Sequence, residues 1–178
     1  RPWPSVTMRL VTRSRRNSFV APELSDWQRR ILTKAVSLVG YPYVWAGTSE
    51  EPQAPLGKPV PGGFDCSGFV WRVFKLESYP GAPSLGATLE GRTTYAMSGE
   101  VGPELRIPFD ELQPADLFFS GDAGPRSKPA QIGHMGIVLG NGWIVHSSGS
   151  GVTLVPIGEY YRERFAWGRR PLSEAGLA

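Results

Sequence analysis

The side chains best suited to nucleophilic chemistry in this chain are Cys66, its single cysteine, and its two histidines, His134 and His146. A cysteine attacks a carbonyl carbon as the thiolate, so its pKa must fall from about 8.5. A helix N-terminus and a neighbouring imidazolium both favour this. A lone cysteine is more often a small buried hydrophobic residue. The surroundings of Cys66 therefore decide between a structural and a catalytic interpretation.

The residues that follow Cys66 predict a helix that begins near it. Apolar side chains recur there at helical spacing, at Phe69, Val70, Val73, Phe74 and Leu76. Glycines flank the cysteine at positions 62, 63 and 68, so backbone could approach a substrate closely there. The first N–H groups of a helix, including that of Cys66, lack partners within the helix and are suited to hold the oxyanion of a tetrahedral intermediate.

The two histidines lie on consecutive predicted strands, 134–139 and 143–147, joined by the turn Gly140-Asn141-Gly142. His134 opens the first strand and His146 closes the second, and these ends are neighbours in an antiparallel pair. One imidazole could then act as a base and the other as its orienting partner. A single histidine on a strand is more often structural. Two on one hairpin, after a cysteine at a helix start, favour catalysis.

The elements that must position these residues predict an α+β fold. Ser25 and Gln28 form a capping-box pattern before an amphipathic helix that Gly40 and Pro42 end. Residues 49–63 are rich in proline and glycine and predict a loop. A short helix is predicted at 93–97, and further strands at 116–120, 152–155 and 164–167. Helices first and a strand meander second indicate an antiparallel sheet.

Composition limits the classes of protein and site. Hydrophobic residues make up 40% and charged residues 20% of the 178 residues, as is typical of a globular domain. One cysteine excludes an internal disulfide and a cysteine-based zinc site. A net charge of +3 without a basic and aromatic stripe does not indicate a nucleic-acid partner. No apolar run is long enough to span a membrane.

Residues 1–23 and 24–178 are expected to differ in role. Residues 1–23 show little periodicity and predict an N-terminal arm or the end of a preceding module, whereas 24–178 predict the catalytic domain. Four arginines (Arg9, Arg13, Arg15 and Arg16) give the arm a basic cluster, which is either simply solvated or attracted to an anionic polymer such as a cell wall. The chain opens without a start Met or a signal-like apolar stretch, so a trimmed product or part of a longer protein is expected.

Several segments resemble the NlpC-type cell-wall cysteine peptidases, a papain-like family. The run Phe64-Asp65-Cys66-Ser67-Gly68-Phe69-Val70 is similar to their nucleophile motif, and Gly133-His134-Met135-Gly136-Ile137-Val138 to their histidine motif. The run Val145-His146-Ser147-Ser148 resembles the third motif, and residues 40–47 and 112–119 resemble two further family segments. Ala46 and Ala115 stand where members commonly have glycine, which leaves the shape of the loops there in doubt.

This resemblance implies a papain-like α+β fold with the cysteine helix packed on an antiparallel sheet. It implies a cysteine endopeptidase that cuts amide bonds in peptidoglycan stem peptides, typically after γ-D-glutamate, with Cys66 as nucleophile and His134 as base. His146 would orient His134, while Tyr43, Asp65 and Ser67 would line the substrate cleft. Asp65 and Ser67 match residues that help bind a free L-Ala amine in some members. No metal or cofactor is expected.

The resemblance also implies a peptidoglycan or muropeptide partner and a secreted or envelope-associated bacterial protein, with a cytoplasmic recycling role left open. A wall-targeting domain before this chain is expected by analogy. Two alternatives stay open, a papain-like amidase or acyltransferase with another substrate and a wall-binding module without catalysis. Asp65 and Ser67 could simply cap the helix, and Tyr43 could simply pack. Four tryptophans (Trp45, Trp71, Trp143 and Trp167) are expected in the core.

Overall fold

The computed structural model of this protein describes residues 19–177. Three α-helices precede the five-stranded sheet along the chain, as predicted, and two more follow strands of that sheet. Helix α1 spans Asp26–Ser37 and begins with the predicted capping box, in which Ser25 and Gln28 each bond the backbone N–H of the other. Ile31 and Ala35 of this helix are buried in the core. Gly40 follows with a φ of 99°, a conformation that glycine adopts without steric cost.

Helix α2, Cys66–Trp71, carries the cysteine at its first position. Asp65 caps it by accepting a hydrogen bond from the N–H of Gly68. The helix continues as a π-helical turn over Arg72–Leu76, so the predicted helix exists with a wider second half. Phe69 and Val70 are fully buried between this helix and the sheet. Helix α3, Thr94–Gly99, corresponds to the short helix predicted at 93–97.

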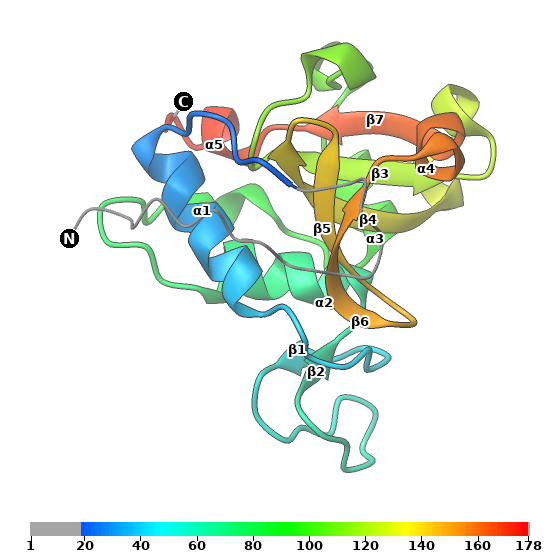
Figure 1. Ribbon diagram of the computed structural model, residues 1–178. Helices are drawn as coiled ribbons and strands as arrows, with labels where there is room; N and C mark the ends of the chain where they lie inside the picture. The colour runs from blue at the N-terminus through cyan, green and yellow to red at the C-terminus, as the bar shows by residue number, and fades with distance from the viewer. Residues whose placement is uncertain (1–18, 178) are drawn as a thin grey trace.

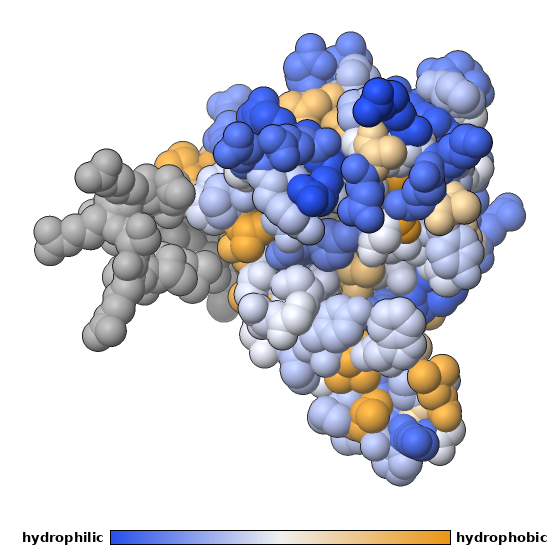
Figure 2. All heavy atoms as spheres, turned by 90° about the vertical axis from the view of Figure 1, so that its right-hand side faces the viewer, coloured by the Kyte–Doolittle hydropathy of each residue, from blue (hydrophilic) through white to orange (hydrophobic). Residues whose placement is uncertain are grey.

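The predicted loop at 49–63 connects two very short strands, β1 (Thr48–Ser49) and β2 (Gly63–Phe64), which pair antiparallel. Between them the chain extends away from the body of the molecule (Figure 1). Figure 2 shows a mainly hydrophilic face with separate hydrophobic patches, some of them on this lower protruding segment. Leu56, within it, is 67% exposed.

The five-stranded antiparallel sheet contains β3 (Leu117–Gly121), β4 (Ile132–Gly140), β5 (Trp143–Ser148), β6 (Gly151–Pro156) and β7 (Phe165–Arg169). The order is β6-β5-β4-β3-β7, so the last strand crosses over to pair with β3. The five predicted strands all exist. Helix α4 (Glu159–Arg164) and helix α5 (Pro171–Glu174) were not predicted from the sequence. The predicted α+β class is confirmed.

The two faces of the sheet bury different side chains because neighbours on a strand point to opposite sides. Met135, Ile137 and Val145 belong to the large core cluster that includes the apolar faces of α1 and α2. Val138 and Ile144 belong to a smaller cluster, against which Tyr161 of α4 packs. His134 and His146 share the parity of this second set, so α4 and the histidines belong to the same side of the sheet.

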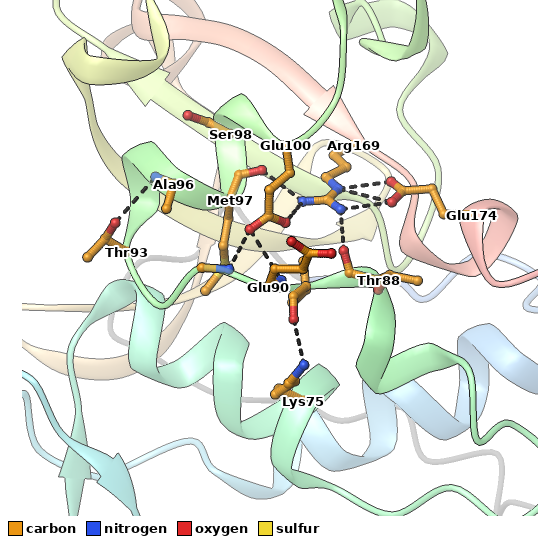
Figure 3. Close-up of polar contacts among 12 residues, drawn as sticks. Lys75, Thr88, Glu90, Thr93, Ala96, Met97, Ser98, Glu100, Arg169 and Glu174 are labelled. Atoms are coloured by element: carbon orange, nitrogen blue, oxygen red, sulfur yellow. Dashed lines mark hydrogen bonds and ion pairs between the residues drawn. The ribbon is translucent and has the colours of Figure 1, made fainter.

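A buried arginine joins the end of β7 to the segment before α3. The guanidinium of Arg169, which is 2% exposed, lies between the carboxylates of Glu100 and Glu174 (Figure 3). It also donates to the carbonyl oxygens of Met97 and Thr88, at 2.8 and 2.5 Å. We call Arg169, Glu100 and Glu174 the arginine cluster. A buried charge is tolerated when its hydrogen-bonding groups are all paired in this way.

Three local expectations are resolved by the backbone and by burial. Ala46 and Ala115 both adopt the left-handed region, with φ of 60° and 71°, so the loops keep a glycine-like shape despite the alanine side chain. Trp167 is buried, but Trp45 is 69% exposed, so the prediction that Trp45 lies in the core is wrong. Val44 is the buried residue of that segment, and the backbone turn at Ala46 leaves its neighbour Trp45 outside.

The predicted arm at 1–23 lies mostly outside the described residues, together with its basic cluster. Within the part that is described, the ring of Phe19 packs on Trp143 at 5.7 Å between centroids. The side chain of Asn141 donates a hydrogen bond of 2.8 Å to the carbonyl of Val20. These residues therefore lie along the β4–β5 turn. Over 19–177, no helix has the length and apolar character needed to cross a membrane.

Candidate active site

Cys66 is half-buried at the first turn of α2, where Asp65 holds the helix start in place. The backbone amides of Ser67, Met135 and Cys66 itself lower the pKa of the thiol and so favour the thiolate. Burial nevertheless raises the pKa of the Cys66 thiol to about 11, and the negative charge of Asp65 adds to the rise. The sequence-based expectation of a depressed pKa is therefore wrong for the free protein, because desolvation exceeds the effect of the N–H groups.

The two histidines are in direct contact. Nε2 of His134 lies 2.7 Å from Nδ1 of His146, and the ring planes are nearly perpendicular. In the tautomer in which Nε2 of His134 donates this bond, Nδ1 of His134 is left without a proton and is free to act as a base. The predicted proximity of the two imidazoles is thus confirmed in the structure.

The β4–β5 register explains how the rings meet. Ile137 pairs with Val145 and Val138 with Ile144, which puts Gly136 opposite His146. A Cβ added to Gly136 would lie 3.0 Å from the Cβ of His146, so the glycine makes room for the imidazole. His146 then reaches diagonally along the sheet to His134, two residues before Gly136 and on the same face.

Burial keeps both imidazoles neutral. Burial, with a smaller contribution from the neighbouring His146, lowers the pKa of His134 to about 4. Burial alone lowers the pKa of His146 to about 4. At neutral pH the site therefore holds a protonated thiol and two uncharged imidazoles. A thiolate would have to form by transfer of the thiol proton to His134, which creates a pair of opposite charges in place.

The residues that directly follow the two histidines link the sheet to the cysteine segment. The strand amide that lowers the pKa of the Cys66 thiol belongs to Met135, the residue directly after His134. A second link joins the other histidine strand to the cysteine segment: the hydroxyl of Ser147 donates a 2.6 Å hydrogen bond to the carbonyl of Phe64. Ser147 follows His146, and Phe64 precedes Asp65 and Cys66. The fully buried Ser147 thereby couples the sheet to the start of the cysteine helix.

Tyr161 is part of the histidine environment, and the sequence analysis missed it. Its ring stacks on His134 at 6.0 Å between centroids, with 28° between the planes. Its hydroxyl lies 3.4 Å from Nδ1 of His146. Tyr161 belongs to α4, whose run of charged and tyrosine residues has no helical apolar stripe from which it could be predicted.

The three residues that the resemblance assigns to substrate binding lie on the cysteine side of the site. Tyr43 is half-buried, and burial raises the pKa of its hydroxyl, with Cys66 and Asp65 near enough to add to the rise. Asp65 and Ser67 are both buried. Asp65 caps α2, so the helix-capping role is confirmed for this residue. Ser67 donates a 3.2 Å hydrogen bond to Asp65.

Arg92 also contacts this side and was not predicted. Its guanidinium donates to the Ser67 hydroxyl at 2.7 Å, to Asp65 at 3.1 Å and to the Gly47 carbonyl at 3.3 Å. The signal that could have identified it is weak, because a single arginine in a loop is usually solvated. Within residues 19–177, no three histidine, cysteine or acidic side chains come together in a way that suits a metal ion.

The sequence profile described as the NlpC/P60 family matches residues 40–170, which include Cys66, His134 and His146. The chain belongs to the NlpC/P60 family. The match covers most of the described residues, so the family resemblance suggested by the motifs is confirmed.

Known NlpC/P60 proteins resemble the chain in sequence and in fold. It is 28% identical over 142 residues to the probable peptidoglycan endopeptidase LytE of Bacillus subtilis, covering 79% of this chain and 34% of that protein. It is 28% identical over 148 residues to the γ-D-glutamyl-L-lysine dipeptidyl-peptidase of the same organism, covering 81% and 41%. The chain thus spans less than half the length of these relatives.

A solved NlpC/P60 structure from Bacillus cereus superposes with a TM-score of 0.60 at 25% identity, covering 88% of this chain and 42% of that one. It shares the helices and antiparallel sheet of the NlpC/P60 fold, so the papain-like α+β architecture is confirmed. Within that architecture, two neutral imidazoles contact each other, and one of them directly precedes the strand residue whose amide lowers the pKa of the Cys66 thiol.

Proposed function

We propose that this chain is a cysteine endopeptidase that hydrolyses amide bonds in bacterial peptidoglycan stem peptides, at the bond between γ-D-glutamate and the diamino acid. The observation that carries the proposal is the 2.7 Å contact of the two imidazoles, together with a cysteine that begins a helix and whose pKa is lowered by the amide of Met135, the residue after His134. The LytE and dipeptidyl-peptidase relatives support the substrate class by their own activities.

In the proposed reaction, Nδ1 of His134 takes the proton of the Cys66 thiol while the sulfur attacks the carbonyl carbon. The carbonyl π electrons move to oxygen, and the N–H groups at the start of α2 stabilise that oxyanion. Collapse of the intermediate breaks the C–N bond, and the imidazolium gives its proton to the leaving amine. A thioester remains. Water then attacks it as His134 takes a proton, and the acid product and free thiol are released.

His146 and Tyr161 act on the base in this proposal. A hydrogen bond from Nε2 of His134 to His146 keeps Nδ1 unprotonated in the free protein and spreads charge when His134 becomes an imidazolium. The stacked Tyr161 ring limits rotation of His134. Both contacts favour one orientation of the base.

The proposal is tested with defined muropeptides. The protein and a Cys66→Ala variant are incubated with disaccharide tri- and tetrapeptides, and products are followed by mass spectrometry. We expect a new amine at the diamino acid with the unchanged protein and none with Cys66→Ala. Absence of products from every muropeptide would contradict the substrate class. Cleavage by Cys66→Ala would contradict the thiol mechanism.

The chain's place in the cell follows from this proposal. A wall-cleaving role requires a secreted or envelope-associated protein, with peptidoglycan as its partner, and a recycling role requires a cytoplasmic one. A wall-targeting domain ahead of the catalytic region would raise the local substrate concentration. Immunodetection of the native protein in culture supernatant, wall and cytoplasmic fractions separates these locations.

A further inference from the structure

The Nδ1 atom of His146 is shared by two hydrogen-bonding groups. Nε2 of His134 lies 2.7 Å from this nitrogen, and the hydroxyl oxygen of Tyr161 lies 3.4 Å from it. The Tyr161 ring stands nearly perpendicular to the His146 ring, at 5.5 Å between centroids. Among residues 19–177, the Tyr161 hydroxyl has no other hydrogen-bond partner in the protein. Three titratable side chains therefore meet at one nitrogen atom.

The short contact between the imidazoles allows two arrangements of protons. In the first, Nε2 of His134 donates to Nδ1 of His146, and Nδ1 of His134 keeps a free lone pair. In the second, Nδ1 of His146 donates, and the proton of His134 lies on its own Nδ1. Only the first arrangement leaves Nδ1 of His134 able to take a proton from the thiol. The distance between the rings is the same in both, so the ring contact alone does not select one.

The Tyr161 hydroxyl distinguishes the two arrangements. In the first, Nδ1 of His146 is unprotonated, so the phenol donates its O–H to the same lone pair that His134 uses. In the second, Nδ1 carries a hydrogen that points at His134, and the phenol oxygen can only accept a share of that hydrogen. A phenol oxygen is a weak acceptor because its lone pair is delocalised into the ring. The hydroxyl therefore stabilises the first arrangement more than the second.

The surroundings of Tyr161 hold its hydroxyl in this place. Its ring packs edge-on against the fully buried Phe118, at 6.1 Å between centroids. The segment before α4 is attached to the β4–β5 turn by a 2.7 Å hydrogen bond from the N–H of Ile157 to the carbonyl of Gly142. Helix α4 lies beside β3 (Figure 1). A ring supported in this way presents its hydroxyl in one direction.

We propose that Tyr161 is a positioning residue whose hydroxyl sets the tautomer of the histidine pair, with the proton between the rings on Nε2 of His134. Nδ1 of His134 is then unprotonated before any substrate binds. Burial keeps both imidazoles uncharged at neutral pH, so the hydroxyl has to select a tautomer and not a charge state. The consequence for catalysis rests on the proposed peptidase function, whereas the tautomer is a property of the free protein.

The test is ¹⁵N NMR of the free protein at pH 7, where both imidazoles are neutral. The chain has only two histidines, and the His146→Gln variant, which keeps one, identifies the ring of His134. Protonated and unprotonated ring nitrogens differ widely in ¹⁵N shift, so the averaged shifts give the population of each tautomer. We expect His134 to be protonated mainly at Nε2. A His134 protonated mainly at Nδ1 would overturn the proposal.

A pair of variants separates the hydroxyl from the ring. Tyr161→Phe keeps the ring, its stack on His134 and its contact with Phe118. The tautomer ratio should shift toward protonated Nδ1 by about two- to tenfold, the range that one hydrogen bond supports. Tyr160→Phe removes a hydroxyl from the exposed neighbouring tyrosine and is the matched control, with no change expected. An unchanged ratio in Tyr161→Phe, or an equal shift in Tyr160→Phe, would overturn the assignment.

Kinetics connect the tautomer to the proposed reaction. In Tyr161→Phe, kcat on a muropeptide should fall by the same factor as the population of His134 with an unprotonated Nδ1. KM should stay nearly unchanged, because the hydroxyl contacts the histidine pair and not the substrate. A fall in kcat without a shift of the tautomer would show a structural role and overturn the assignment. If no muropeptide is cleaved, the peptidase proposal fails, and the NMR ratio still supports or overturns the role of Tyr161.

Discussion

The two sides of the candidate active site are built from different forces. On the histidine side, His134, His146 and Tyr161 contact one another as aromatic rings, and burial keeps both imidazoles neutral. On the cysteine side, Asp65 and Arg92 form an ion pair. A base must be able to gain and lose a proton, so a charged partner that fixed its state would hinder it. Side chains proposed to contact substrate have no such need and can carry permanent charges.

The anchoring of the two sides differs as well. The histidines are placed by strand register, which is set by backbone hydrogen bonds and by the turn at 140–142. Arg92 is placed by side chains from distant parts of the chain, above all Glu100 and Arg169. A side-chain contact can be removed by a single substitution, whereas a change of strand register moves every side chain of the strand together.

The largest effect is expected on the histidine side. His134→Ala removes the proposed base and should lower kcat by about 10³ to 10⁴-fold, near the upper end for acid–base catalysis. Alkylation of Cys66 by iodoacetamide at pH 7 should slow in the same variant, because the buried thiol then has no proton acceptor. His146→Gln keeps a hydrogen-bonding group and should lose less, about 10²-fold. Equal losses in both variants would contradict the division into base and orienting residue.

On the cysteine side, loss of an anchor should affect stability first. Arg169→Ala leaves Glu100 and Glu174 without their buried cation and should lower the free energy of unfolding by about 3–5 kcal/mol. Urea denaturation measures the change. Arg29→Ala, which breaks the exposed pair with Asp26, should cost less than about 1 kcal/mol and serves as the control. A loss in Arg169→Ala no greater than in Arg29→Ala would show that the arginine cluster does not anchor the fold.

The neutral histidines predict a pH dependence of stability. In the unfolded chain both imidazoles bind protons near pH 6.5, whereas in the folded protein they do so only near pH 4. Between these values the unfolded state binds more protons, so the free energy of unfolding falls as the pH falls from 6.5 toward 4 and is fully retained above 6.5. From pH 7 to pH 5 the loss should be about 2 kcal/mol for each imidazole.

Urea denaturation of the unchanged protein and of His146→Gln at both pH values isolates this contribution. Between pH 7 and pH 5, the free energy of unfolding should fall by about 2 kcal/mol less in the variant than in the unchanged protein. The contribution of other titrating groups is the same in both proteins and cancels when the two changes are subtracted. Identical pH dependence in the two proteins would contradict a buried neutral His146.

The smallest effect concerns the backbone that supports Asp65. Ala46 donates to Asp65 from a left-handed conformation that costs an alanine about 1–2 kcal/mol. Ala46→Gly removes this cost. Glycine also raises the conformational entropy of the unfolded chain, which destabilises the folded protein by about 0.4–1 kcal/mol, so the net gain in stability should be about 0.5 kcal/mol. Ala35→Gly, within α1, should destabilise by about 1 kcal/mol or more. A destabilised Ala46→Gly would show that the methyl group matters more than the backbone.

Local signals determined much of the architecture. The capping box at Ser25, the helix after Cys66 and the five strands follow from patterns within a few residues, and each exists in the structure. The motif around Cys66 and the histidine hairpin allowed the catalytic set to be proposed, since hairpin partners are close in sequence. The sequence left open whether the loops at Ala46 and Ala115 keep the backbone shape that glycine would give them, and the positive φ angles of both residues decide this.

Tertiary structure alone decided the features that depend on distant partners. Tyr161 reaches the histidines because β7 crosses over to β3 and carries α4 across the sheet, and no local pattern encodes that crossover. Arg92 meets Asp65, 27 positions away, only because the arginine cluster holds the intervening loop. The direction of the Cys66 pKa shift was also beyond the sequence, because burial depends on how the whole chain packs around the sulfur. Spacing along a chain specifies hydrogen bonds within an element, whereas desolvation and long-range ion pairs depend on the assembled fold.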